Sequence, residues 1–451
     1  MTAVDRHLLR IRLAEERGRF VDIHPRSAQL AAQAKENLLT GVPMAWMTRW
    51  AGNFPLFMDS AVGARVADVD GNEYIDFALG DTGAMTGHAL PFLADVLADR
   101  ARHGITTMLP TEDAIWVAGE LSRRFGLPLW QLALTATDAN RFALRIARYL
   151  TGRPKILVFD WCYHGSVDET LVTMGPSGDT ELRGSNIGAQ VHPSHTTKVV
   201  QFNDIPALEA ALAPGDVACV LAEPALTNIG IVLPDPGYHD ALREICTRTG
   251  TLLIIDETHT ISAGPGGATA AWGLQPDMLT IGKPIAGGIP AAAYGMTAEI
   301  GARLEDFFNS EGVDVSGIGG TLAGNALSVA AIRATLGHAL RERDYDIAIP
   351  LAERWTDGVA SVIATYALPW TVQRLGCRGE YWFCEPPRNG AQAAAAIDPE
   401  LEAWFHLFMM NNGVLLTPFH TMALLSSSHV AADVDRHTAT FAEAVDRILA
   451  R

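Results

Sequence analysis

The stretch TLLIIDETHTISAGPGGATAAWGLQPDMLTIGKPIAGG, residues 251–288, contains two apolar runs that each lead to a charged side chain. The first run ends on Asp256, and the second is followed directly by Lys283. Because lysine is strongly hydrated and rarely buried without a task, its place after a predicted buried strand calls for an explanation. Three interpretations follow from these residues: a buried Asp256–Lys283 ion pair, a helix-capping Asp256 with an unrelated surface lysine, or a reactive lysine beside a carboxylate.

Three earlier apolar runs have the same character as these two. They are KILVFD (155–160), KVVQF (198–202) and ACVLAEP (218–224), and amphipathic helical patterns lie between several of the runs. Strands that alternate with helices predict a mostly parallel sheet that binds ligands beyond the carboxyl ends of its strands. We expect this sheet to form a large domain over residues 90–335.

The flanking parts of the chain have a different pattern. Residues 5–39 show apolar residues at helical spacing, and 64–80 read as extended chain around a DGN turn, which predicts a hairpin. Residues 336–451 mix helical and extended patterns. We therefore expect an α/β protein in which residues 1–89 and 336–451 form a small α+β domain built from both termini.

Composition excludes several function classes. The chain has 451 residues, 48% of them hydrophobic and 19% charged, with a formal net charge of -17. Nucleic acids and anionic membranes favour basic surfaces, so neither is an expected partner. The five cysteines are scattered without metal-ligand or disulfide spacing, so we expect no metal and a reducing compartment. No run of about 18 apolar residues occurs, and we expect a cytoplasmic protein.

An anion site is predicted where TATDANRFALRIARYLTGR, residues 135–153, begins an amphipathic helix. The backbone amides of Ala136 and Thr137, the threonine hydroxyl and the helix dipole suit a phosphate, although an ordinary helix N-cap explains the same residues. A phosphate site, a reactive lysine and a carboxylate are what pyridoxal 5′-phosphate requires, with Lys283 for its aldehyde and Asp256 for its ring nitrogen.

Further candidates follow other strands. Tyr163 lies in FDWCYHG, where an aromatic ring either closes a core or stacks on a planar cofactor. Glu223 and Asn228 lie in AEPALTNIG, and Thr321 follows two glycines in GGTLAGNALSVAA, 319–331.

Seven segments in this order resemble the class III aminotransferases of pyridoxal phosphate fold type I, and within them glutamate-1-semialdehyde aminomutase and the omega and β-amino-acid transaminases. The segments are GARVADVDGNEYIDF, TATDA, CYHG, AEP, LLIIDET, IGKPIAGG and GGTLAGNALS, so the resemblance covers almost the whole chain.

This resemblance implies a role for each candidate. Lys283 matches the lysine that holds the cofactor, and Asp256 matches the partner of its ring nitrogen. Tyr163 matches the ring that stacks on it. Ala136 and Thr137 match the phosphate turn. Asn228 falls near the position that faces the phenolic oxygen, with Glu223 in the same segment, and Thr321 matches a contact to the neighbouring subunit's phosphate, which implies a homodimer with shared sites.

Two departures from the family pattern concern the cofactor. Thr258 stands where the family commonly has valine against the ring, and the phosphate turn reads TATDA in place of SGTEA. Because threonine carries a hydroxyl where valine has a methyl group, we expect the electronic environment of the cofactor ring to differ from that of the family at Thr258. At Ala136 a methyl group replaces a glycine hydrogen, which tightens the approach of a phosphate without preventing it.

The expected substrate pocket lacks an arginine in the two places where the family often has one. These stretches read GVPMAWMTRW (41–50) and GVLLTPFHTM (413–422). We expect Trp46, Met47 and Phe419 to wall an apolar pocket with His420 as a polar contact, or else to be core residues. Arg49 and Arg378 are the candidates for a carboxylate contact from a shifted position.

The leading sequence-based hypothesis is a class III transaminase that moves an amino group from an amine or amino acid with a hydrophobic side to a carbonyl acceptor. An aminomutase of the glutamate-1-semialdehyde type is the first alternative, because it needs the same residues. A non-catalytic binding protein of the same fold is the second. The expected partners are small amines and carbonyl compounds.

Overall fold

The computed structural model describes residues 4–418 and 420–449. The chain divides into two units, which are described separately. Unit 1 comprises residues 1–90, 343–386 and 396–451, and unit 2 comprises residues 91–342 and 387–395. Residues 387–395 belong to unit 2, although the sequence division assigns them to the C-terminal part of the small domain.

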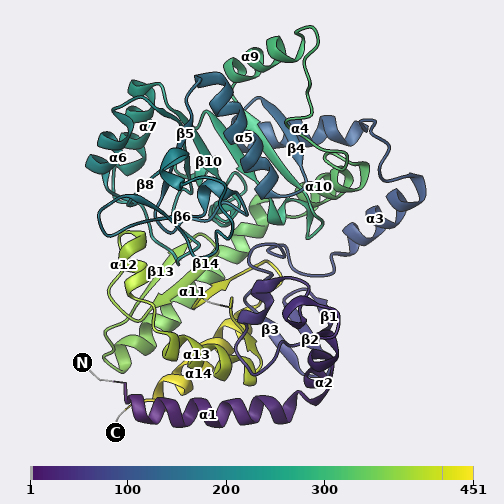
Figure 1. Ribbon diagram of the computed structural model, residues 1–451. Helices are drawn as coiled ribbons and strands as arrows, with labels where there is room; N and C mark the ends of the chain where they lie inside the picture. The colour runs from purple at the N-terminus through teal and green to yellow at the C-terminus, as the bar shows by residue number, and fades with distance from the viewer. Residues whose placement is uncertain (1–3, 419, 450–451) are drawn as a thin grey trace. The chain divides into compact units, whose positions relative to one another are not determined.

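A seven-stranded sheet forms the centre of unit 2, drawn in blue to green in Figure 1. Its order is β4-β12-β11-β10-β9-β5-β8, and only β12 runs against the others. This confirms the predicted mostly parallel sheet. The strands are β4 (Leu129–Ala133), β5 (Lys155–Phe159), β8 (Thr197–Val200), β9 (Val217–Ala222), β10 (Leu252–Asp256), β11 (Met278–Ile281) and β12 (Ala292–Met296).

Helices cover this sheet because its central strands are apolar on both faces. All six residues of β9 are buried, as expected for a parallel strand between two layers. Helix α5 (Ala136–Thr151) packs on β4, β9, β10, β11 and β12 through a stripe of buried residues. The other elements of unit 2 are α3 (Pro91–His103), α4 (Glu112–Phe125), α6 (Ile205–Leu212), α7 (Tyr238–Thr249), α8 (Gly267–Ala271), α9 (Ala298–Phe308), α10 (Ala326–His338), α12 (Gly390–Ala395) and the hairpin β6 (Val172–Met174) with β7 (Thr180–Leu182).

Unit 1 combines both ends of the chain. Strand β15 (Val414–Leu415) pairs in parallel with β3 (Glu73–Asp76), which forms the expected hairpin with β2 (Arg65–Asp68). Its core is rich in aromatic side chains and includes Trp355, Trp404 and Phe405. The remaining elements are α1 (Arg6–Ile23), α2 (Pro25–Ala34), β1 (Met58–Val62), α11 (Glu342–Thr365), β13 (Thr371–Leu375), β14 (Arg378–Trp382), α13 (Pro399–Asn411), β16 (Met422–Leu424) and α14 (Ala431–Asp446). None of the described helices is long and apolar enough to cross a bilayer.

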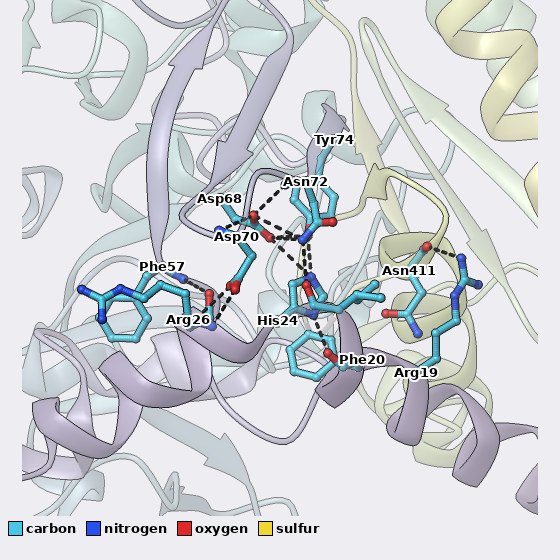
Figure 2. Close-up of polar contacts among 12 residues, drawn as sticks. Arg19, Phe20, His24, Arg26, Phe57, Asp68, Asp70, Asn72, Tyr74 and Asn411 are labelled. Carbon is cyan, nitrogen blue, oxygen red and sulfur yellow. Dashed lines mark hydrogen bonds and ion pairs between the residues drawn. The ribbon is translucent and has the colours of Figure 1, made fainter.

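The helical pattern over residues 5–39 is divided at His24, where Pro25 starts a new helix. A buried polar network holds this break, as Figure 2 shows. His24 Nδ1 lies 2.7 Å from the carbonyl of Phe20, and His24 Nε2 lies 2.8 Å from the Tyr74 hydroxyl. That hydroxyl donates to Asp68 Oδ2 at 2.7 Å. Burial and the Asp68 carboxylate raise the pKa of Tyr74, so its hydroxyl remains a donor.

Replacing Tyr74 with phenylalanine tests the strength of this network. We expect Tyr74→Phe to lower the free energy of unfolding by about 1–3 kcal/mol, because His24 and Asp68 lose a buried partner. Tyr381→Phe is the matched control, since the Tyr381 hydroxyl is buried without a hydrogen-bond partner in the described part of the chain. Urea unfolding followed by tryptophan fluorescence measures both variants, and equal losses would contradict the network's role.

Candidate active site

Several polar side chains of unit 2 gather at the carboxyl ends of its parallel strands. Asp256 ends β10, and Lys283 follows the neighbouring strand β11 by two residues. The strands pair in parallel, with Asp256 opposite Thr280. Glu223 follows β9, on the other side of β10. The sheet therefore brings these ends to one edge, where α/β proteins bind their ligands.

Asp256 is the best-connected group of this edge. His164 Nδ1 and Asn140 Nδ2 each lie 2.9 Å from its Oδ2, and the backbone amide of Thr258 donates to its Oδ1 at 3.0 Å. Asn140 is held in turn, because the Thr280 hydroxyl donates to its Oδ1 at 2.6 Å. Helix α5, the turn after β5 and the turn after β10 therefore all donate to one carboxylate.

These contacts keep the Asp256 carboxylate charged although it is only 4% exposed. Burial alone would raise its pKa, but the hydrogen bond and charge of His164, with the contacts of Thr258 and Asn140, lower the pKa to about 2. Burial likewise disfavours a charged His164, but Cys162 and Asp256 raise the pKa of its imidazole well above the ordinary value. A carboxylate held as an anion suits a protonated ring nitrogen as its partner.

The predicted anion turn lies at the start of α5. Thr135 caps the helix by accepting from the amide of Asp138 at 3.2 Å, and the first-turn amides of Ala136 and Thr137 have no carbonyl to bind within the helix. The Thr137 hydroxyl accepts from the amide of Ser166 at 3.1 Å. This bond joins the turn to the segment that carries Tyr163 and His164.

Two glycines allow this turn to approach its neighbours closely. A Cβ at Gly165 would lie 2.2 Å from Thr137 Oγ1, and a Cβ at Gly282 would lie 3.0 Å from Ala136 Cβ. Gly282 immediately precedes Lys283, so the lysine and the anion turn are neighbours in unit 2. Since real Cβ contacts are longer, neither position has room for a side chain without movement.

Lys283 itself has an unusual backbone. Its φ is +50°, in the left-handed region that residues with a Cβ rarely occupy. Such strain persists where the surrounding structure imposes it and is common at active sites. Its side chain is half-buried, and Nζ lies 2.6 Å from Nε2 of His259.

The other cofactor candidates in unit 2 have defined positions. Tyr163 is 39% exposed, and its amide donates to Glu223 Oε1 at 3.4 Å. Glu223 is buried and accepts from the Thr227 amide at 3.0 Å. Asn228 donates to the carbonyl of Trp161 at 3.2 Å. Thr258 is buried beside Asp256.

Thr321 and the expected substrate residues lie elsewhere in the chain. Thr321 is exposed after Gly319 and Gly320, whose φ values are +117° and +138°. In unit 1, Trp46 is exposed, Met47 is half-buried, and His420 is buried with its Nδ1 3.4 Å from Glu380 Oε1.

Arg378 is fully buried in unit 1, with its guanidinium against the Thr82 hydroxyl and 3.0 Å from the Met422 sulfur. Phe419 lies outside the described residues.

The sequence analysis did not assign roles to Asn140, His164 and His259. The signal for His164 and His259 was their place within a few residues of Tyr163 and Asp256. Asn140 carried a weaker signal: it lies one helical turn after Ala136, on the face of α5 that is otherwise apolar. Within residues 4–418 and 420–449, no cluster of three His, Cys, Asp or Glu side chains could hold a metal ion.

The residues of this edge fit pyridoxal 5′-phosphate in their chemistry. Asp256 offers a charged acceptor for the ring nitrogen, Tyr163 an exposed aromatic face, the start of α5 amide donors for a phosphate, and Lys283 an amine for an aldehyde. Each of these four groups belongs to unit 2, and the close contacts at Gly165 and Gly282 join the segments that carry Tyr163 and Lys283 to the start of α5.

Comparison with known proteins supports the same chemistry. Residues 46–440 match the family described as aminotransferase class-III. A curated glutamate-1-semialdehyde 2,1-aminomutase of Opitutus terrae is 33% identical over 408 residues, which are 89% of this chain and 94% of the relative.

Solved structures extend this likeness. A glutamate-1-semialdehyde-aminomutase from Pseudomonas aeruginosa is 48% identical, with a TM-score of 0.96 over 99% of this chain and 100% of its own. A lysine-to-alanine variant from the same organism was solved in complex with PMP. An omega-transaminase from Sphaerobacter thermophilus is 26% identical, with a TM-score of 0.84 over 94% of this chain and 97% of its own.

A methyl group at Gly165 tests the anion turn. We expect Gly165→Ala to weaken binding of pyridoxal 5′-phosphate by at least about tenfold, because the added Cβ displaces Thr137 from the start of α5. Gly178→Ala is the matched control: its φ of +84° imposes the same backbone strain, but nothing lies within 4 Å of the added Cβ. Absorbance titration of each variant with the cofactor gives the affinities. Similar losses in both would show that strain alone, and not the contact with Thr137, matters.

Proposed function

The chain belongs to the class III aminotransferases, a family of pyridoxal 5′-phosphate-dependent enzymes, and on this basis we propose that it is an aminomutase of the glutamate-1-semialdehyde type. Such an enzyme moves the amino group of its substrate from carbon 2 to carbon 1 and needs no separate acceptor. The observation that carries this proposal is the 48% identity over 99% of the chain to a protein so described. It favours the aminomutase over the transaminase that leads the sequence-based hypotheses.

The residues of unit 2 would divide the chemistry between them. Bound pyridoxal phosphate supplies an electron sink that stabilises negative charge on the substrate carbon next to the amino group. Asp256 keeps the ring nitrogen protonated, and His164 and Asn140 keep Asp256 oriented and charged. Lys283 Nζ, once free as an amine, takes a proton from one carbon and returns it to another.

The phosphate and the ring would be held by the elements around this centre. Ala136 and Thr137 offer amides and a hydroxyl to the phosphate, and Tyr163 and Thr258 would lie against the two faces of the ring. Glu223 and Asn228 would shape the side of the phenolic oxygen. Each of these assignments follows from the family pattern and from the positions of the residues at the strand ends.

An intermolecular transaminase is the second candidate, favoured by the chemistry of unit 1. The stretch 413–422 contains no arginine, and Arg378 is buried against Thr82 and Met422. If Trp46, Met47, Phe419 and His420 line the substrate pocket, as proposed from the family pattern, the substrate would have a hydrophobic side.

We also propose a homodimer with shared sites. The support is the exposure of Thr321 on a glycine-rich segment, where the family pattern has a contact to the neighbouring subunit's phosphate. Leu322 beside it is 50% exposed, as is usual for an apolar side chain at an interface. The five free cysteines suit a reducing compartment such as the cytoplasm.

A turnover assay with and without acceptor separates the two functions. We expect the full-length protein with pyridoxal phosphate to convert glutamate 1-semialdehyde to 5-amino-4-oxopentanoate, with pyruvate or 2-oxoglutarate changing the rate by less than about twofold. Lys283→Ala should lose at least about a thousandfold, because it removes the proton-transferring amine. Product is measured by mass spectrometry.

The transaminase hypothesis predicts a different outcome in these assays. Turnover of an aromatic or aliphatic amine that depends on a keto acid, with no conversion of glutamate 1-semialdehyde, would contradict the aminomutase and support the transaminase.

A further inference from the structure

Residues 160–166, called here the Tyr163 turn, follow strand β5 and carry both Tyr163 and His164 to the edge where the cofactor is proposed to bind. The contact of His164 with Asp256 holds the end of this turn. The direction of a side chain follows the backbone that carries it. The place of the Tyr163 ring therefore also depends on what holds the start of the turn.

The first residue of the Tyr163 turn, Asp160, binds a hairpin. Its buried carboxylate accepts from the Thr173 hydroxyl at 2.8 Å and the Met174 amide at 3.0 Å, both on β6. It also accepts from Gln201 Nε2 at 2.7 Å. Strand β7 pairs with β6 in antiparallel, and Arg183 follows β7 directly. The hairpin therefore brings Arg183 back to the turn.

Arg183 contacts the two residues that precede Tyr163. Its guanidinium carbon lies 5.0 Å from the centroid of the Trp161 ring, where the negative face of the indole attracts a cation. Its Nη1 donates to the carbonyl of Cys162 at 2.7 Å. Trp161 has a φ of +65°, in the left-handed region, and such a conformation persists only where the surrounding structure imposes it. Arg183 supplies part of that support from outside the seven-stranded sheet.

The amide of Tyr163 makes a weak contact. It donates to Glu223 Oε1 at 3.4 Å, which is longer than an ordinary hydrogen bond, and the residue itself is exposed. The position of the Tyr163 ring therefore depends on its neighbours in the turn, and Arg183 holds the two neighbours on the N-terminal side.

We infer that Arg183 is a positioning residue, which holds the Tyr163 ring in the place where it stacks on pyridoxal 5′-phosphate. Arg183 acts through Trp161 and Cys162, and the stacking itself belongs to Tyr163. Aromatic stacking depends on the offset and tilt of the rings, and a ring that is already in place loses less conformational freedom when the cofactor binds. The inference rests on the proposed function, because the stacking role of Tyr163 comes from the family pattern.

A double-mutant cycle on the full-length chain freed of cofactor tests this inference. The wild type, Arg183→Met, Tyr163→Ala and the combined variant are each titrated with pyridoxal 5′-phosphate, and absorbance gives the dissociation constants. Methionine keeps much of the length of the arginine side chain but has no charge and no N–H donor. We expect Arg183→Met to weaken binding at least about fivefold when Tyr163 is present and less than about twofold when it is alanine, because no ring then remains to be positioned.

Two further variants serve as controls. Arg153 is a half-buried arginine of unit 2 that also donates to backbone carbonyls, those of Val217 and Thr249 at 3.0 and 2.9 Å. It precedes β5, at the opposite end of that strand from the Tyr163 turn, so Arg153→Met should change the affinity for the cofactor by less than about twofold. Arg183→Lys keeps a positive charge and a donor, and it should bind the cofactor within about threefold of the wild type.

Equal losses from Arg183→Met with and without the Tyr163 ring would overturn the inference, because a general loosening of the turn also reaches His164 and persists without the ring. Wild-type affinity in Arg183→Met or in Tyr163→Ala would overturn it as well, as would an Arg183→Lys protein that binds as weakly as Arg183→Met. The amplitude of each titration reports the folded fraction separately from the affinity, so partial unfolding of a variant does not hide the result. No amino substrate is present, so a wrong substrate assignment leaves the outcome unchanged, whereas a wild type that binds no pyridoxal phosphate would contradict the proposed function.

Discussion

The ionised carboxylate of Asp256 is the constraint around which unit 2 is arranged. Placing an anion at the end of a buried strand costs several kcal/mol unless donors compensate for the lost water. The donors come from three separate parts of the chain: the turn after β5 gives His164, α5 gives Asn140, and the turn after β10 gives the amide of Thr258. Because Asn140 is one helical turn from Ala136, holding the carboxylate also fixes the start of α5 and its anion turn.

Close backbone approach is the second requirement, and it explains why glycine precedes Lys283 and follows His164. The contacts of Gly282 with Ala136 and of Gly165 with Thr137 bring three chain segments nearer than side chains would permit. The same compactness places Lys283 in the left-handed region at some cost in backbone strain. A site that combines strain, a buried charge and an amine is less stable than an apolar core of equal size, which is typical of catalytic centres.

The sequence predicted five strands of the seven-stranded sheet and missed β4 and β12. The five predicted strands each contain a run of apolar residues, but β4 (Leu129–Ala133) alternates exposed and half-buried residues before the buried Ala133 at the sheet edge. Strand β12, AAYGM, is made largely of small residues with low strand propensity, so its burial depends on neighbours far away in the chain. The break at His24 was missed because the helical spacing continues across Pro25.

Some residues of the candidate site can be found from local sequence pattern, whereas others are identified only by contacts in the folded chain. Lys283, Asp256 and the anion turn stand at strand and helix ends, which a sequence reveals. The partners of Asp256 and Lys283 do not. Asn140 meets Asp256 across 116 positions of the sequence, and His259 meets Lys283 across 24, so each contact exists only once the sheet has formed. The partners of Asp256 keep it charged, so the site differs in its chemistry from a simple Asp256–Lys283 ion pair.

All residues assigned here to the cofactor belong to unit 2, whereas the proposed substrate contacts belong to unit 1. Under this proposed division, substitutions in unit 1 would change the substrate while the cofactor chemistry of unit 2 is retained, since a fold carries different activities through changes at its sites.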